Sequence, residues 1–215
     1  MAQLFPKWTN KTPRMVASFF GVGAVGATLV VWKFFAPGFL WAGYRPQQPV
    51  PYSHLLHVGQ LGLDCRYCHT GVERGAKAAV PPAATCMNCH RTIRADSPLL
   101  APIREAAAGG KAVEWVKVHG LADYVYFDHS RHVNAGIGCV SCHGRIDQME
   151  VVRQVAPLSM FWCLDCHRAP ENHLRPREHV TSMDWKAEPD QRTLGLRLKQ
   201  ERGINPPQHC SACHR

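Results

Sequence analysis

The distribution of apolar and charged residues divides the chain into an apolar N-terminal run and a polar remainder. Eighteen residues from Met15 to Trp32 carry no charge, and after Lys33 a second uncharged stretch runs from Phe34 to Tyr44. At about 1.5 Å per residue, the first run forms a helix roughly 27 Å long, close to the bilayer hydrocarbon thickness of about 30 Å. The pattern therefore predicts a transmembrane anchor helix over residues 15–42.

The charges that flank this run predict its orientation. Lys7, Lys11 and Arg14 precede it without any acidic residue, so residues 1–14 are expected to form a basic cytoplasmic N-terminus with the rest of the chain outside. A cleaved signal peptide is the alternative, but residues 39–43 offer no convincing small-residue cleavage site. We therefore expect a single-pass membrane protein whose chain beyond the anchor lies outside the cytoplasm.

Beyond the anchor, apolar periodicity is weak. Residues 43–52 form a Pro-rich linker, which is typical of a stiff, extended connection. Two short helices are indicated, one over Leu99–Ala108 after Ser97-Pro98 and one over Asp190–Arg202 before Gly203. Val113–Val118 is the only candidate strand. The predicted fold class is mainly α with much irregular structure.

Every cysteine belongs to one repeated motif. The ten cysteines form five C-x-x-C pairs, and a histidine follows each pair directly. In chain order, motifs 1 to 5 consist of Cys65, Cys68 and His69; Cys86, Cys89 and His90; Cys139, Cys142 and His143; Cys163, Cys166 and His167; and Cys210, Cys213 and His214. Because no cysteine is left over, one chemistry should account for all of them.

C-x-x-C-H is the attachment motif of c-type haem, in which both thiols form thioethers with the haem and the histidine binds the iron. We therefore predict five covalently bound haem c groups, with the five motif histidines as proximal ligands. Zinc ribbons and disulfide scaffolds are the alternatives, but neither explains a histidine after every second cysteine. Thioredoxin-like redox pairs would need a βαβ context that five scattered copies lack.

Five haems change how composition and charge are interpreted. Residues 53–215 are expected to form a pentahaem cytochrome c domain whose core consists of stacked haems, since little chain is available for each. The 25 Lys and Arg exceed the 16 Asp and Glu, giving a formal net charge of +9, but the haem propionates offset it. The basic residues are scattered, so nucleic-acid binding is not indicated.

Eight further histidines are available as distal ligands. Two repeated segments, each aromatic-x-His-x-x-His, precede motifs 1 and 3, which divides the domain into two dihaem units and one terminal haem. Histidines three residues apart on a helical turn project in similar directions and can reach neighbouring haems. The predicted distal ligands are His54, His57, His119, His129 and His132. Met149 and Met160 are alternatives, since a thioether ligand would raise the potential of its haem.

The anchor, the two aromatic-x-His-x-x-His segments and the five motifs together resemble the pentahaem cytochrome c subunit of alternative complex III. The resemblance covers the whole chain, including the segment Cys139–Arg168 with its two methionines. It implies a role in a bacterial quinol:acceptor oxidoreductase at the inner membrane, with the haem domain in the periplasm. The implied partners are integral membrane quinol-binding subunits, an iron–sulfur subunit and a periplasmic electron acceptor.

Three functions remain open at this point. The first is an electron-transfer subunit that is not a catalytic chain by itself. The second is a stand-alone membrane-anchored multihaem quinol dehydrogenase, which needs an acid-base group near the membrane, where residues 33–51 offer only Lys33 and Arg45. The third is a catalytic multihaem reductase, which needs an iron without a distal ligand and is disfavoured by the surplus of histidine.

Overall fold

The computed structural model describes residues 5–35 and 42–214. The chain divides into two compact units, Met1–Leu40 and Trp41–Arg215. Within the described residues no β-sheet is formed, and the only bridges between extended segments are Val125 with His214 and Ile137 with Leu174. This confirms the predicted fold class, mainly helical with much irregular structure.

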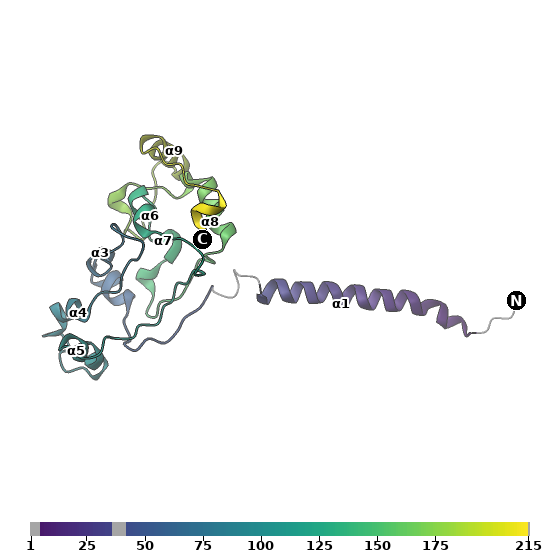
Figure 1. Ribbon diagram of the computed structural model, residues 1–215, viewed down its shortest axis with the longest axis horizontal. Helices are drawn as coiled ribbons and strands as arrows, with labels where there is room; N and C mark the ends of the chain where they lie inside the picture. The colour runs from purple at the N-terminus through teal and green to yellow at the C-terminus, as the bar shows by residue number, and fades with distance from the viewer. Residues whose placement is uncertain (1–4, 36–41, 215) are drawn as a thin grey trace. The chain divides into compact units, whose positions relative to one another are not determined.

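The first unit is one long apolar helix. A 3-10 turn, η1 (Lys7–Lys11), continues directly into α1 (Thr12–Phe35), drawn in purple in Figure 1. By length and composition the segment Lys7–Phe35 is able to cross a membrane. The helix begins three residues before the predicted start, and residues 36–41 of the predicted 15–42 segment lie outside the described residues.

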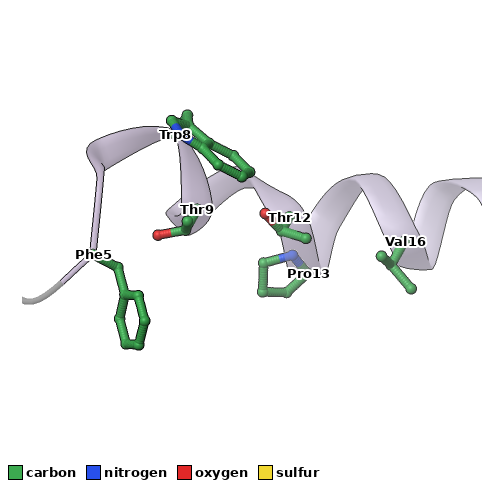
Figure 2. Close-up of a pocket in the computed structure, with 6 residues that line it drawn as sticks. All are labelled: Phe5, Trp8, Thr9, Thr12, Pro13 and Val16. Atoms are coloured by element: carbon green, nitrogen blue, oxygen red, sulfur yellow. The ribbon is translucent and has the colours of Figure 1, made fainter.

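The start of this helical segment carries a shallow groove with a mainly apolar lining. The lining residues are Phe5, Trp8, Thr9, Thr12, Pro13 and Val16. Figure 2 shows Phe5, Pro13 and Val16 along one side of the segment, with the indole of Trp8 on the other. A Trp at the end of an apolar helix is typical of the membrane–water boundary.

The second unit consists of short helices joined by irregular segments (Figure 1). The α-helices are α3 (Cys65–Cys68), α4 (Ala83–His90), α5 (Ala101–Ala107), α6 (His129–Ala135), α7 (Val140–His143), α8 (Met160–Arg168), α9 (Gln191–Glu201) and α10 (Cys210–Cys213). The other turns are the π-helix η2 (Leu55–Gln60) and the 3-10 helices η3 (Pro98–Leu100), η4 (Ile146–Gln148), η5 (Pro170–Asn172) and η6 (Arg177–His179).

A small hydrophobic cluster packs around α9. Leu174, Leu194 and Leu198 are its buried members. The helix begins where the sequence predicts it, because the Asp190 carboxylate accepts a hydrogen bond from the Thr193 backbone N–H at 2.8 Å. A cluster of this size cannot by itself hold together a unit of this length, so other groups must fill the remaining interior.

The Pro-rich segment lies along the second unit. The Gly43 N–H donates to the Gln154 carbonyl at 2.7 Å, and the Gln154 N–H donates to the Tyr44 carbonyl at 3.0 Å. Further along, the Gln48 side chain bonds both the N–H and the C=O of Val116 at 2.9 Å. The predicted strand Val113–Val118 is therefore wrong, because a side chain takes the backbone groups that a neighbouring strand would need.

Candidate haem-binding site

Motifs 1, 3 and 5 each form a single helical turn. The backbone N–H of the motif histidine bonds the carbonyl of the first cysteine, at 2.8 Å for His69, 3.0 Å for His143 and 2.9 Å for His214. This turn places two thiols and one imidazole close together, as attachment to one haem requires. All ten cysteine thiols are free of disulfides.

The rings of three motif histidines are oriented by backbone carbonyls. Nδ1 of His69 contacts the Ala79 carbonyl at 2.7 Å, Nδ1 of His90 the Ile93 carbonyl at 2.8 Å, and Nδ1 of His167 the Pro207 carbonyl at 2.7 Å. Because a carbonyl can only accept, each Nδ1 carries the proton and each Nε2 keeps its lone pair. This is the tautomer that a histidine needs to bind a metal through Nε2.

The two His-x-x-His segments have nearly the same local geometry. The Tyr52 ring stands edge-on to His54, with centroids 4.8 Å apart, and stacks on His57 at 4.4 Å. Phe127 likewise stands edge-on to His129 at 4.8 Å and stacks on His132 at 4.7 Å. Nδ1 of the second histidine again bonds a carbonyl, Ser53 for His57 and Asp128 for His132, both at 2.8 Å.

Three of these histidines face motif histidines at a specific spacing. The ring centroids of His57 and His90 are 6.2 Å apart, those of His132 and His167 are 6.1 Å apart, and those of His129 and His143 are 6.5 Å apart. Two imidazoles that bind one metal from opposite sides have centroids about 6 Å apart, because each metal–nitrogen bond is about 2 Å and each ring adds about 1 Å. The residues therefore fit three irons with two histidine ligands each.

Burial favours the neutral form of His54 and His143. Burial, with the neighbouring His69 ring as the next cause, lowers the pKa of His54 to about 4. Burial, followed by the nearby His119 and His129 rings, lowers the pKa of His143 to about 3. A protonated imidazole cannot bind iron, so this environment favours the ligand form.

His54 and His119 have contacts that differ from those of the three paired histidines. Nδ1 of His54 is buried without a hydrogen-bond partner, and so is Nε2 of His119. His119 packs edge-on against His143 with centroids 4.4 Å apart. That separation is too short for two ligands on opposite sides of one iron, whereas His129 has the expected separation from the same ring. The distal roles of His54 and His119 stay predictions.

The structure gives the two methionines different environments. Met149 is buried, and its carbonyl accepts the Leu55 N–H at 3.0 Å, beside the first His-x-x-His segment. Met160 begins α8 and is 57% exposed. His214 of motif 5 has the Tyr124 ring nearby, with centroids 5.7 Å apart. A thioether role for either methionine stays a prediction.

Several groups that hold the site together carry no sequence signal. Arg175 is 7% exposed and donates to the Ser182 carbonyl at 2.9 Å, while its guanidinium lies 5.0 Å from the centroid of the Trp185 ring. It also packs on Gly138, directly before motif 3, where a Cβ would collide with the guanidinium. The carbonyl of Ala76 accepts a hydrogen bond from Nδ1 of His129 at 2.8 Å. Such partners become visible only in the folded chain.

Comparisons with known proteins agree with this geometry. Residues 125–215 match the family described as cytochrome c7 and related cytochrome c. Over 203 residues the chain is 30% identical to the multihaem cytochrome c subunit of menaquinone reductase from Nitratidesulfovibrio vulgaris (strain Hildenborough), covering 91% of this chain and 89% of that protein. These matches support the multihaem cytochrome part of the predicted resemblance. The narrower assignment to alternative complex III stays a prediction.

Proposed function

Because the chain belongs to the family of multihaem cytochromes c that includes this menaquinone reductase subunit, we propose that it carries electrons between a membrane quinone and a periplasmic redox protein. The observation that carries the proposal is the set of three imidazole pairs with centroids 6.1, 6.2 and 6.5 Å apart. Irons bound by two histidines suit electron transfer rather than substrate binding, because both axial positions are filled.

The proposed haem sites use every motif. Each of the five cysteine pairs would attach one haem and the adjoining histidine would be its proximal ligand, giving five covalently bound haems c. His57, His129 and His132 are the proposed distal ligands for motifs 2, 3 and 4, and His54 is the proposed distal ligand for motif 1. Haem supplies reversible one-electron chemistry, while the chain supplies ligand identity, burial and orientation, which together tune its potential.

The apolar helix supports a location at the membrane. We propose that residues 1–14 are cytoplasmic, that the helix within residues 15–42 is the anchor, and that residues 53–215 form the periplasmic domain after the 43–52 connector. The partners would be integral membrane subunits that bind quinone and an iron–sulfur subunit of the same complex. The described part of the first unit has no buried residue in α1, as expected of a helix that packs on lipid or another membrane helix.

Two directions of electron flow have separate support. The name of the relative favours flow from a periplasmic donor to menaquinone. The sequence resemblance to alternative complex III favours the reverse, from quinol to a periplasmic acceptor. The same haem-binding residues serve both directions, because transfer between haems is reversible.

Native membranes provide the test. We would extract them in mild detergent, separate complexes by native electrophoresis with haem staining, and identify the stained band by mass spectrometry. The proposal expects this chain to migrate with integral membrane proteins and an iron–sulfur subunit. A band that holds this chain alone and is still reduced by a quinol analogue would instead support the stand-alone quinol dehydrogenase.

The direction of flow needs a second assay on the same purified complex. Reduced periplasmic carrier is mixed with a menaquinone analogue in one experiment, and quinol analogue with oxidised carrier in the other. Faster turnover in the first identifies a quinone reductase, and faster turnover in the second identifies a quinol oxidase.

A further inference from the structure

The contacts between motifs follow an order in space that differs from their order in the chain. Each motif is joined to its neighbours by hydrogen bonds or by the histidine pairs described above, and motif 1 lies between motifs 2 and 3. The contacts can be followed one link at a time.

Motif 2 contacts motif 1. The Asn88 side-chain amide in α4 donates to the Tyr67 hydroxyl in α3 at 2.9 Å. The first His-x-x-His segment spans the same two motifs, because His57 faces His90 and His54 has the His69 ring as a neighbour. Two histidines on one turn thus reach two adjacent haem sites.

Motif 1 contacts motif 3, although their histidines, His69 and His143, are 74 positions apart in the chain. The Thr181 hydroxyl donates to the carboxylate of Asp64, directly before Cys65, at 2.8 Å, and the neighbouring Val180 carbonyl accepts the Cys139 N–H at 2.9 Å. Two contacts support this link from α6, since Nδ1 of His129 bonds the Ala76 carbonyl at 2.8 Å and the Asn134 amide donates to the Glu73 carbonyl at 3.0 Å. The two dihaem units are therefore joined through motifs 1 and 3.

Motif 3 is followed by motif 4. The second His-x-x-His segment, in α6, spans them in the same way that the first segment spans motifs 1 and 2. His129 faces His143 of motif 3, and His132 faces His167 of motif 4. The two dihaem units thus repeat one design.

Motif 5 is attached to motif 4. Nδ1 of His167 bonds the carbonyl of Pro207, three residues before Cys210, at 2.7 Å. From the other side, the Tyr126 N–H donates to the Cys213 carbonyl at 2.8 Å, directly before Phe127, whose ring stacks on the His132 that serves motif 4.

The exposure of the cysteines is a second, independent indication of which motifs lie at the two ends of this series. Cys89 of motif 2 and Cys210 of motif 5 are exposed, whereas the other eight cysteines are partly buried. Figure 1 shows α4, α3, α7 and α8 following one another across the second unit, with the C-terminal end beside α8. The exposed motifs are therefore those with one neighbour, and the more buried motifs 1, 3 and 4 have two.

We propose that electrons cross the domain in the order motif 2, 1, 3, 4, 5, in either direction, so that motifs 2 and 5 are the two points of entry and exit. This inference rests on the proposed function. Each step oxidises one ferrous haem and reduces its ferric neighbour, with no bond or proton exchanged. The quinone side of the complex serves one end, and a periplasmic one-electron carrier serves the other.

The test uses the full-length chain with its haems in detergent. A redox titration is followed by NMR of the haem methyl groups, which reports the reduction of each haem separately. His57→Met replaces the proposed distal ligand of motif 2, an end, and His132→Met makes the same change at motif 4, an internal site. A methionine ligand raises the potential of its haem, so that haem accepts its electron earlier. The added negative charge then lowers the potential of haems in contact with it.

The proposed order predicts different responses from the two variants. Apart from the haem whose ligand is changed, His57→Met should shift the titration of the motif 1 haem only, and His132→Met should shift those of the motif 3 and motif 5 haems. A shift at motif 3 or 5 in the first variant, or at motif 2 in the second, would overturn the order. In His132→Met, a shift of the motif 3 haem without a shift of the motif 5 haem would also overturn the order.

Loss of a haem from a variant would be detected by mass spectrometry, and the unaltered chain then decides the question. In an experimental structure of the haem-loaded protein, the four shortest iron–iron distances should join motifs 2 and 1, 1 and 3, 3 and 4, and 4 and 5. Any other set overturns the order. Neither measurement involves quinone, so failure of the chain to migrate with a quinone complex would refute the proposed function and leave the order intact.

Discussion

Removal of the His132 imidazole tests the pairing of histidines most sharply. His132 faces His167 with centroids 6.1 Å apart, and its Nδ1 is held by the Asp128 carbonyl at 2.8 Å. In His132→Ala the motif 4 iron would lose its distal ligand, while the ligands of the other four sites are unchanged. A five-coordinate iron is high-spin and can bind an external ligand.

The magnitude follows from the count of motifs. One of five haems changes, so the low-spin signal should fall by about one haem per chain relative to the unaltered protein, and the reduced variant should bind one more carbon monoxide per chain than the unaltered protein does. The assay is an optical carbon monoxide titration combined with electron paramagnetic resonance of the oxidised protein. His179→Ala is the matched control, because His179 stacks on Trp185 with centroids 5.7 Å apart and is not a proposed ligand. A low-spin, unreactive His132→Ala protein, or an equal effect in the control, would refute the pairing.

Three further substitutions test parts of the fold. Leu174→Ala removes a fully buried side chain and should lower the free energy of unfolding by about 2–5 kcal/mol in a denaturant titration; a loss well below that range would show that the α9 cluster is not a core. Asp190→Ala removes the side chain that caps α9 at Thr193 and should lower the free energy of unfolding by about 1 kcal/mol in the same assay. Asp190→Asn, the matched control, should leave that free energy unchanged. Phe127→Leu removes the ring stacked on His132 and should shift the paramagnetic resonance of the motif 4 haem while its low-spin state persists; an unchanged spectrum would show that the ring does not orient the imidazole.

Local structure was predictable from the sequence where short-range chemistry determines it. The long apolar run gives α1, and the Asp190 cap with Gly203 beyond the end gives α9. The His-x-x-His spacing predicts two imidazoles on one turn that reach neighbouring sites; His129 and His132 of the second copy and His57 of the first have the separations that this requires. Each of these features depends on residues within a few positions of one another.

Long-range features could not be predicted, because they depend on which segments meet. The extended segment Val113–Val118 has the composition of a strand, but its backbone bonds the Gln48 side chain instead. His119 precedes motif 3 just as the other candidates do, yet only the fold shows that its ring lies too close to His143. The hydrogen bonds from His129 and Asn134 to the carbonyls of Ala76 and Glu73, which join the two dihaem units, have no local signature.

We propose that the chain carries five electrons, one for each motif. A reductive titration of the purified full-length protein, with electrons counted by coulometry against polypeptide concentration, measures this number. We expect five electrons per chain, all accompanied by the spectral change of c-type haem. Four or fewer electrons per chain, with every cysteine pair intact in the polypeptide, would contradict it.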